Sequence, residues 1–142
     1  MSMLGNDLFA AKHFEDALSV GVAELSMLRR LGASEESILT TQSNLASTYD
    51  MLGREEEALQ MDRDVYSGYL KLYGEEHPDT LRVAYNYANA LQGLGRHEEA
   101  NVLYRKMIPV ARRVLGNSHE TTLRMRANYA STLVNLGGAA TL

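Results

Sequence analysis

Apolar side chains recur along this chain at spacings of three and four residues, which gathers them on one face of an α-helix. The clearest stripes are Ile38, Thr41, Leu45, Tyr49 and Leu52; Val83, Tyr87, Leu91 and Leu94; and Met125, Tyr129, Leu133 and Leu136. The chain has only two prolines, and no segment shows the alternation of β-branched residues that is typical of strands. The pattern predicts an all-α fold.

The stripes repeat at a constant distance along the chain. Three asparagines, Asn44, Asn86 and Asn128, are equally spaced and define a 42-residue period. A glycine falls at every half period, at Gly32, Gly53, Gly74, Gly95, Gly116 and Gly137. A glycine just after a helical stripe favours a left-handed C-terminal cap, and self-similarity at a fixed period is typical of a stacked repeat array. We therefore expect two helices in each unit of the repeat.

The expected array is a single domain, residues 1–142, with three helix pairs and one further helix, seven in all. Its units are expected to span about 1–32, 33–74, 75–116 and an incomplete 117–142. The first unit is the least regular, and we expect it to contain a short helix, a turn and a second helix. Later helices are expected at 55–73, at 97–115 and at 118–136, the last of them ending before Gly137.

Two prolines and one serine mark particular points in these helices. Ser34 precedes two glutamates and is predicted to cap a helix start, where negative charge is also favourable. Pro78 suits a first helical turn, because its missing N–H would be unpaired there in any case. Pro109 falls in the middle of an expected helix, where it removes a hydrogen bond and clashes with the preceding turn. We expect a bend near Ile108, and a bend at Gly68 in the previous partner helix stays open.

Composition limits the classes of function. The chain of 142 residues is 45% apolar and 23% charged, which suits a folded globular domain. It has no cysteine, so disulfides, thiolate metal sites and cysteine nucleophiles are excluded. A net charge of −4 gives no reason to expect nucleic acid, and no apolar run is long enough to cross a membrane. We expect a cytoplasmic protein with neither of these partners.

The units resemble tetratricopeptide repeats. That family's order of a large apolar residue, a small one and then an aromatic residue or leucine is matched by Leu45, Ala46 and Tyr49, by Tyr87, Ala88 and Leu91, and by Tyr129, Ala130 and Leu133. The 42-residue period and the loop with His77 and Pro78 are similar to the repeats of kinesin light chains. The resemblance implies a right-handed superhelical solenoid of antiparallel helix pairs, with the first helix of each pair on the concave side.

The first helices carry amides and hydroxyls where ordinary solvated faces carry mixtures of Lys and Glu. The candidate residues of a peptide-binding groove are Asn44, Ser47, Arg82, Tyr85, Asn86, Asn89, Arg124, Asn128 and Ser131. An Asn amide donates to a peptide C=O and accepts from its N–H, so a ladder of asparagines suits an extended backbone. An alternative stays open, in which the repeated asparagines only bridge neighbouring repeats and the arginines are solvated.

Arg82 and Arg124 stand one repeat apart, and we expect no acidic residue beside them. An extended segment that carries at least one carboxylate is therefore the expected ligand. Some members of the resembled family clamp a partner's C-terminal carboxylate with lysine, asparagine and arginine. The corresponding positions here are Ser2, Asn6, Asn44, Arg82 and Asn86. Two cations of that set are missing, so a full clamp is not expected.

No catalytic, metal or cofactor site is predicted. The histidines at 13, 77, 97 and 119 lack the spacing of metal ligands, and capping or solvated roles are expected for them. The predicted function is a non-enzymatic module that binds an extended, acidic peptide of a partner protein. The alternative is a scaffold that assembles with itself. A homo-oligomer would form through the C-terminal helix, whose stripe of Met125, Tyr129 and Leu133 has no partner helix after it.

Overall fold

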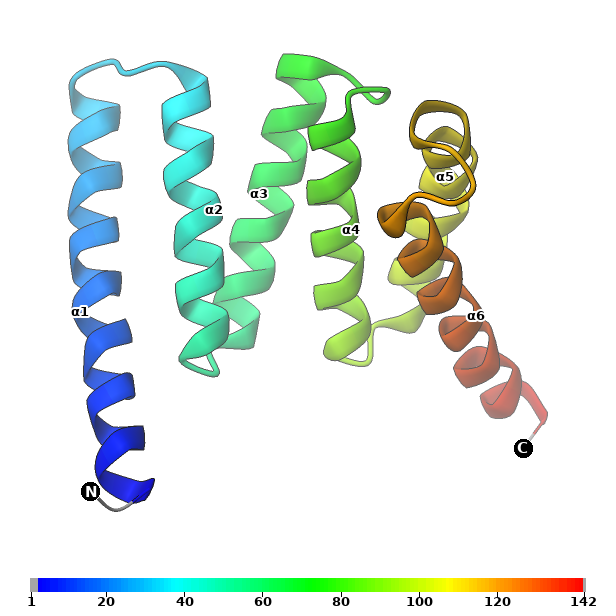
Figure 1. The fold of residues 1–142 in the computed structure, drawn as a ribbon, viewed down its shortest axis with the longest axis horizontal. Helices are drawn as coiled ribbons and strands as arrows, with labels where there is room; N and C mark the ends of the chain where they lie inside the picture. The colour runs from blue at the N-terminus through cyan, green and yellow to red at the C-terminus, as the bar shows by residue number, and fades with distance from the viewer. Residues whose placement is uncertain (1–2, 142) are drawn as a thin grey trace. The chain divides into compact units, whose positions relative to one another are not determined.

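The computed structural model describes the backbone of residues 3–141 and the side chains of residues 10–137. Within that part the chain forms six α-helices and no strand (Figure 1). They are α1 (Met3–Arg30), α2 (Glu35–Met51), α3 (Glu55–Tyr73), α4 (Pro78–Gly93), α5 (His97–Leu115) and α6 (Glu120–Thr141). The all-α prediction is confirmed, and so are the expected helices at 55–73 and 97–115.

The first compact unit, Met1–Val65, contains α1, α2 and the first part of α3. Helices α1 and α2 lie side by side (Figure 1), and Leu18, Leu25 and Leu45 form the buried core between them. Gly21 permits this close approach, because a Cβ atom there would lie 2.7 Å from Cδ2 of Leu45. Ser34 caps α2 as predicted, with its Oγ accepting a hydrogen bond from the N–H of Ser37 at 3.2 Å.

The seven-helix prediction is wrong in the part of the chain that the structure describes. The first unit was expected to contain a pair of helices, but α1 runs unbroken from Met3 to Arg30. The reason lies at the expected turn, where Ala11 and Lys12 stand in place of the glycine of the later units. A left-handed turn costs a residue with a Cβ atom about 1–2 kcal/mol, whereas alanine and lysine favour helix. The chain therefore continues as one helix.

The turns inside the later helix pairs follow the prediction. Gly53 and Gly95 have φ angles of 73° and 76°, in the left-handed region. In each turn the N–H of the next residue, Arg54 or Arg96, donates to a carbonyl five residues earlier over 2.9 Å. The two turns therefore repeat in their hydrogen bonds as well as in their sequence.

The predicted helix end at Gly137 is also wrong. Helix α6 continues through this residue to Thr141, and Gly137 lacks the positive φ angle of Gly32, Gly53, Gly74, Gly95 and Gly116. The sequence after Gly137 is Gly-Ala-Ala-Thr, which has no charged residue to begin a new helix. The two alanines that follow favour helix and offset part of the cost of the two glycines, and no capping residue stops α6 at Gly137.

The second compact unit, Tyr66–Leu142, contains the end of α3 and helices α4, α5 and α6. Helix α5 packs against both α4 and α6, and α4 also contacts α6. Residues with at most 1% exposure at the centre of this unit include Leu81, Ala84, Ala100, Tyr104, Ala111 and Met125. Pro109 lies on the exposed side of α5, which stays helical through it. The bends near Ile108 and Gly68 stay predictions.

Candidate peptide-binding surface

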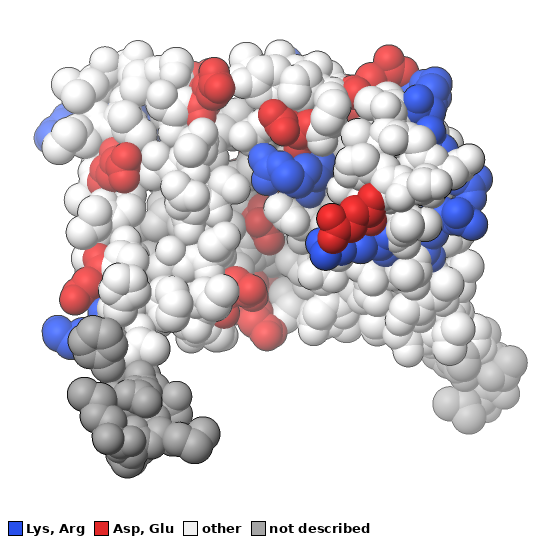
Figure 2. All heavy atoms as spheres, in the orientation of Figure 1, with Lys and Arg blue, Asp and Glu red and all other residues white. Residues whose placement is uncertain are grey.

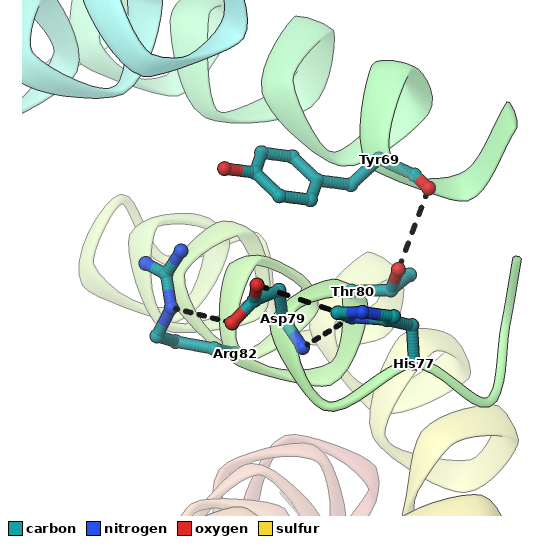
Figure 3. A network of polar contacts seen from close by, with 5 residues as sticks. All are labelled: Tyr69, His77, Asp79, Thr80 and Arg82. Atoms are coloured by element: carbon teal, nitrogen blue, oxygen red, sulfur yellow. Dashed lines mark hydrogen bonds and ion pairs between the residues drawn. The ribbon is translucent and has the colours of Figure 1, made fainter. Parts of the chain in front are cut away.

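The start of α4 is fixed by a short network of polar contacts (Figure 3). Nδ1 of His77 accepts a hydrogen bond from the backbone N–H of Asp79 at 3.1 Å, and Pro78 occupies the first turn. Thr80 is fully buried, and its Oγ1 donates to the carbonyl of Tyr69 at 3.4 Å. The network anchors α4 to the end of α3.

The same contacts recur one repeat later, at the start of α6. Nδ1 of His119 accepts from the N–H of Thr121 at 3.1 Å, and the buried Thr122 donates to the carbonyl of Ala111 at 3.4 Å. The expected capping role is confirmed for His77 and His119. Among the residues that the structure describes, no group of three or more His, Asp or Glu side chains could hold a metal ion.

Asn128 joins the two first helices of the second unit. Its Nδ2 donates to the hydroxyl of Tyr85 at 3.5 Å and to Oδ1 of Asn89 at 3.3 Å, both on α4. Close by, the hydroxyl of Tyr104 on α5 donates to Oε1 of Gln92 at 3.1 Å. The structure thus brings together Tyr85, Asn89 and Asn128 of the predicted site. This is the type of contact that the bridging alternative describes.

The other candidate residues continue in rows along the same helices, which we call the first-helix rows. The row on α4 is Arg82, Asn86 and Asn89, all exposed; the matching row on α6 is Arg124, the half-buried Asn128 and Ser131. Asn86 makes no side-chain hydrogen bond within the described part of the chain. On α2, Asn44 and Ser47 are exposed at the positions one repeat earlier. Of the clamp positions, Ser2 and Asn6 lie outside the side chains that the structure describes.

The expectation that the two arginines have no acidic neighbour is wrong. Nε of Arg82 lies 4.0 Å from Oδ1 of Asp79, and Arg124 forms an ion pair with Glu120. These partners stand three and four residues earlier on the same helices, a spacing at which side chains meet. All four side chains are at least 50% exposed, so the pairs contribute little stability. A ligand carboxylate would nevertheless have to compete with them.

Sequence reasoning missed a groove of about 360 Å³ between α1 and α2. Its lining comprises His13, Asp16, Ala17, Val20, Gly21, Glu24, Thr41, Asn44, Leu45 and Thr48. Asn44 is therefore a groove residue, but of a groove made with α1. It was missed because it depends on how α1 packs against α2, which the sequence alone does not show. The small residues Ala17 and Gly21, one helical turn apart, were the available signal.

An acidic pair in the first unit stands where the second unit has a neutral one. Asp50 and Asp62 occupy the positions one repeat before Gln92 and Tyr104, which hydrogen-bond to each other. Burial raises the pKa of Asp62 to about 6, and the nearby charge of Asp50 contributes to the increase. Burial also raises the pKa of Tyr104 to about 12, while a hydrogen bond with Asn128 acts in the opposite direction. Asp62 thus places a carboxyl group at the position where the next repeat has the hydroxyl group of Tyr104.

The sequence profile of the family described as Tetratricopeptide repeat matches residues 37–113, more than half of the chain. The chain belongs to the tetratricopeptide repeat family. The predicted resemblance to tetratricopeptide repeats is confirmed. A search of curated proteins found no match.

Solved structures share the fold. A putative kinesin light chain of Podosopora anserina, described as having nearly identical TPR-like repeats, is 23% identical, with a TM-score of 0.77 over 94% of this chain and 64% of that one. A point variant of the same protein is 22% identical, with a TM-score of 0.79 over the same shares. BtubC (BKLC) from P. vanneervenii is 19% identical, with a TM-score of 0.73 over 87% of this chain and 49% of that one.

At these identities the likeness establishes the helical repeat fold alone. The tetratricopeptide repeat protein described here spans between about half and two thirds of the length of those chains. No helix in its described residues is both long and apolar enough for a membrane span.

Proposed function

We propose that this tetratricopeptide repeat protein binds an extended peptide segment of a partner protein along the first-helix rows. Repeats of this family generally serve as protein–protein interaction modules. The observation that carries the proposal is the exposed amide of Asn86, unpaired within the described residues, between Arg82 and the Asn89–Asn128 contact. An amide in this setting can pair with both the C=O and the N–H of a ligand backbone. Ser131 continues the row on α6, and Asn44 and Ser47 hold the equivalent positions in the first unit.

The proposed ligand carries at least one carboxylate. Arg82 and Arg124 have acidic neighbours, but an exposed ion pair is worth only about 0–1 kcal/mol. Replacing such a pair by a carboxylate that is bound in place is therefore inexpensive. We assign no catalytic role and no cofactor to this surface, and we propose that the protein acts in the cytoplasm.

The test is a titration of labelled extended peptides of equal length, some neutral and some with one or two glutamates, at two salt concentrations. Losing a neutral amide contact should cost about 0.5–1.5 kcal/mol, and losing a charge-assisted contact about 1.5–3 kcal/mol. Arg82→Ala should therefore weaken the binding of the acidic peptides more than Asn86→Ala does. Gln60→Ala, which removes an exposed amide from α3, is the matched control and should leave binding unchanged.

Two results would separate the parts of this proposal. If Asn86→Ala were the more damaging change and salt had no effect, backbone capture would stand and the preference for carboxylates would be refuted. If neither variant changed the affinity, the first-helix rows would not be the binding surface.

A second candidate function, self-assembly as a scaffold, is favoured by one observation. Helix α6 exposes three large apolar residues, Leu123 at 49%, Leu133 at 45% and Val134 at 73%. A second copy of the chain could cover them in a homo-oligomer. Sedimentation of the wild type and of Leu133→Gln/Val134→Gln over a wide concentration range decides this, because a monomer throughout would remove the candidate.

A further inference from the structure

The charges of this chain are unevenly divided between its two compact units. Residues 1–65 contain five Lys or Arg and twelve Asp or Glu, a formal charge of −7. Residues 66–142 contain nine Lys or Arg and six Asp or Glu, a formal charge of +3. The two values add up to the net charge of −4 of the whole chain. Within the second unit, no acidic residue occurs between Glu99 and Glu120, a stretch that contains four basic ones. The net negative charge of the chain conceals a locally basic surface.

That surface has a shallow depression that is largely open to solvent. A groove of about 650 Å³ is lined by Pro109, Arg112, Arg113, Asn117 and Arg126, from α5, the loop after it and α6. We call it the Pro109 groove. Figure 2 shows basic side chains gathered at the right of this view, over the helices that Figure 1 labels α5 and α6.

The arginines of the Pro109 groove differ in their partners. Arg113 forms an ion pair with Glu76, in the loop before α4. Arg112 and Arg126 form no ion pair with any residue that the structure describes. Two guanidinium groups therefore converge on one groove with their hydrogen-bonding capacity unused. A guanidinium presents two parallel N–H donors that match a carboxylate or a phosphate.

Other groups in the Pro109 groove favour a polypeptide over a phosphate chain. Pro109 has no N–H, so it contributes an apolar ring and no hydrogen-bond donor to the groove. The side-chain amide of Asn117 both donates and accepts. A peptide backbone supplies N–H donors to the amide oxygen of Asn117, whereas phosphodiesters and phospholipid headgroup phosphates supply only acceptors.

We propose that the Pro109 groove binds an acidic segment of a partner protein, with carboxylates on Arg112 and Arg126. This site is separate from the first-helix rows. Arg126 stands two residues before Asn128, which is more than half a turn around α6. The two surfaces can therefore be disabled independently.

The experiment measures fluorescence anisotropy of a labelled oligoglutamate peptide titrated with the full chain at low and moderate salt. Removing both unpaired guanidiniums in Arg112→Gln/Arg126→Gln should weaken binding about tenfold or more. Arg112→Lys/Arg126→Lys keeps the charge but loses the paired donors, so its loss should be smaller. The matched control is Arg29→Gln/Arg30→Gln, which removes two exposed arginines from the last turn of α1 and should change binding less than twofold. Circular dichroism checks that each variant is folded.

Three outcomes would overturn the proposal. The first is equal loss of binding in the α1 control, which would indicate a general charge effect. The second is that single-stranded RNA or phosphatidylserine vesicles bind more tightly than the peptide, and that Arg112→Gln/Arg126→Gln abolishes this binding. That result would make the groove a phosphate site. The third is loss of peptide binding in Asn86→Ala but not in Arg112→Gln/Arg126→Gln, which would place the acidic segment on the first-helix rows.

Discussion

Replacing Asp62 by asparagine should stabilise the protein at neutral pH. Asp62 is half-buried on α3 with the carboxyl group of Asp50 nearby, and these two causes, burial first, raise its pKa from 3.8 to about 6. At pH 7 the folded chain therefore holds an ionised carboxylate in a poorly solvated place. Asparagine has nearly the same shape and carries no charge, so it removes this penalty.

The size of the effect follows from the two pKa values. Each pH unit between the folded and unfolded values corresponds to about 1.4 kcal/mol, so the difference corresponds to at most about 3 kcal/mol. Because Asp62 keeps some contact with solvent, we expect about 1–3 kcal/mol from Asp62→Asn at pH 7.5. The folded state holds the proton of Asp62 more tightly than the unfolded chain does. Its contribution to stability is therefore fully present below about pH 4 and is lost as the pH rises through about 6.

The assay is denaturant unfolding followed by circular dichroism, on wild type and Asp62→Asn, at pH 4.5 and at pH 7.5. Comparing the two proteins at each pH cancels the titration of all other groups. The advantage of the variant should be about three times larger at pH 7.5 than at pH 4.5, because most of the penalty develops between those two pH values. Asp64→Asn is the control, because Asp64 is an exposed aspartate on the same helix whose neighbour Gln60 can still donate to the new amide. Equal differences at the two pH values, or no gain at pH 7.5, would refute the reasoning.

Further expectations concern local packing and helix ends, and all are measured by thermal or denaturant unfolding. Gly21→Ala should destabilise by about 1–3 kcal/mol, because the new Cβ would press on the buried Leu45; no loss would mean that the helices can separate freely. Gly53→Ala should cost about 1 kcal/mol through its φ of 73°, whereas Gly93→Ala, at the helical end of α4 with open space around it, should stabilise by about 0.5–1 kcal/mol. His77→Ala removes an N-cap acceptor and should cost about 0.5–2 kcal/mol, and an unchanged midpoint would contradict that role.

Much of the fold could be predicted because the repeat places the same local signals at the same positions. Gly53 and Gly95 determine the tight turns, and His77 and His119 cap the helices that follow the loops. These are interactions between residues close in sequence, so a single chain is enough to reveal them. The positions of helices and turns in one repeat then predict their positions in the next.

The failures lie at two helix boundaries and in contacts between side chains. At Ala11 and Lys12 the glycine is missing, and the apolar pattern alone could not show that the helix would continue. The bridging role of Asn128 was left as an open alternative and the arginines of the Pro109 groove were not foreseen, because both depend on packing between helices, which the sequence does not contain. The acidic neighbours of Arg82 and Arg124 could have been predicted from the sequence, because Asp79 and Glu120 stand three and four residues earlier on the same helices.

The departures from the repeat also indicate where the two units differ in role. A position that keeps the same contacts in successive copies, such as Thr80 and Thr122, holds the array together. A position whose residue type differs between the repeats does not make these repeated contacts, so its side chain can serve another role. The Asp50–Asp62 pair and the net charge of −7 belong to the first unit, while the +3 charge and the Pro109 groove belong to the second. We therefore attribute the stability of the array to the contacts that repeat, such as those of Thr80 and Thr122, and propose that the unrepeated charges of the second unit add the binding site at the Pro109 groove.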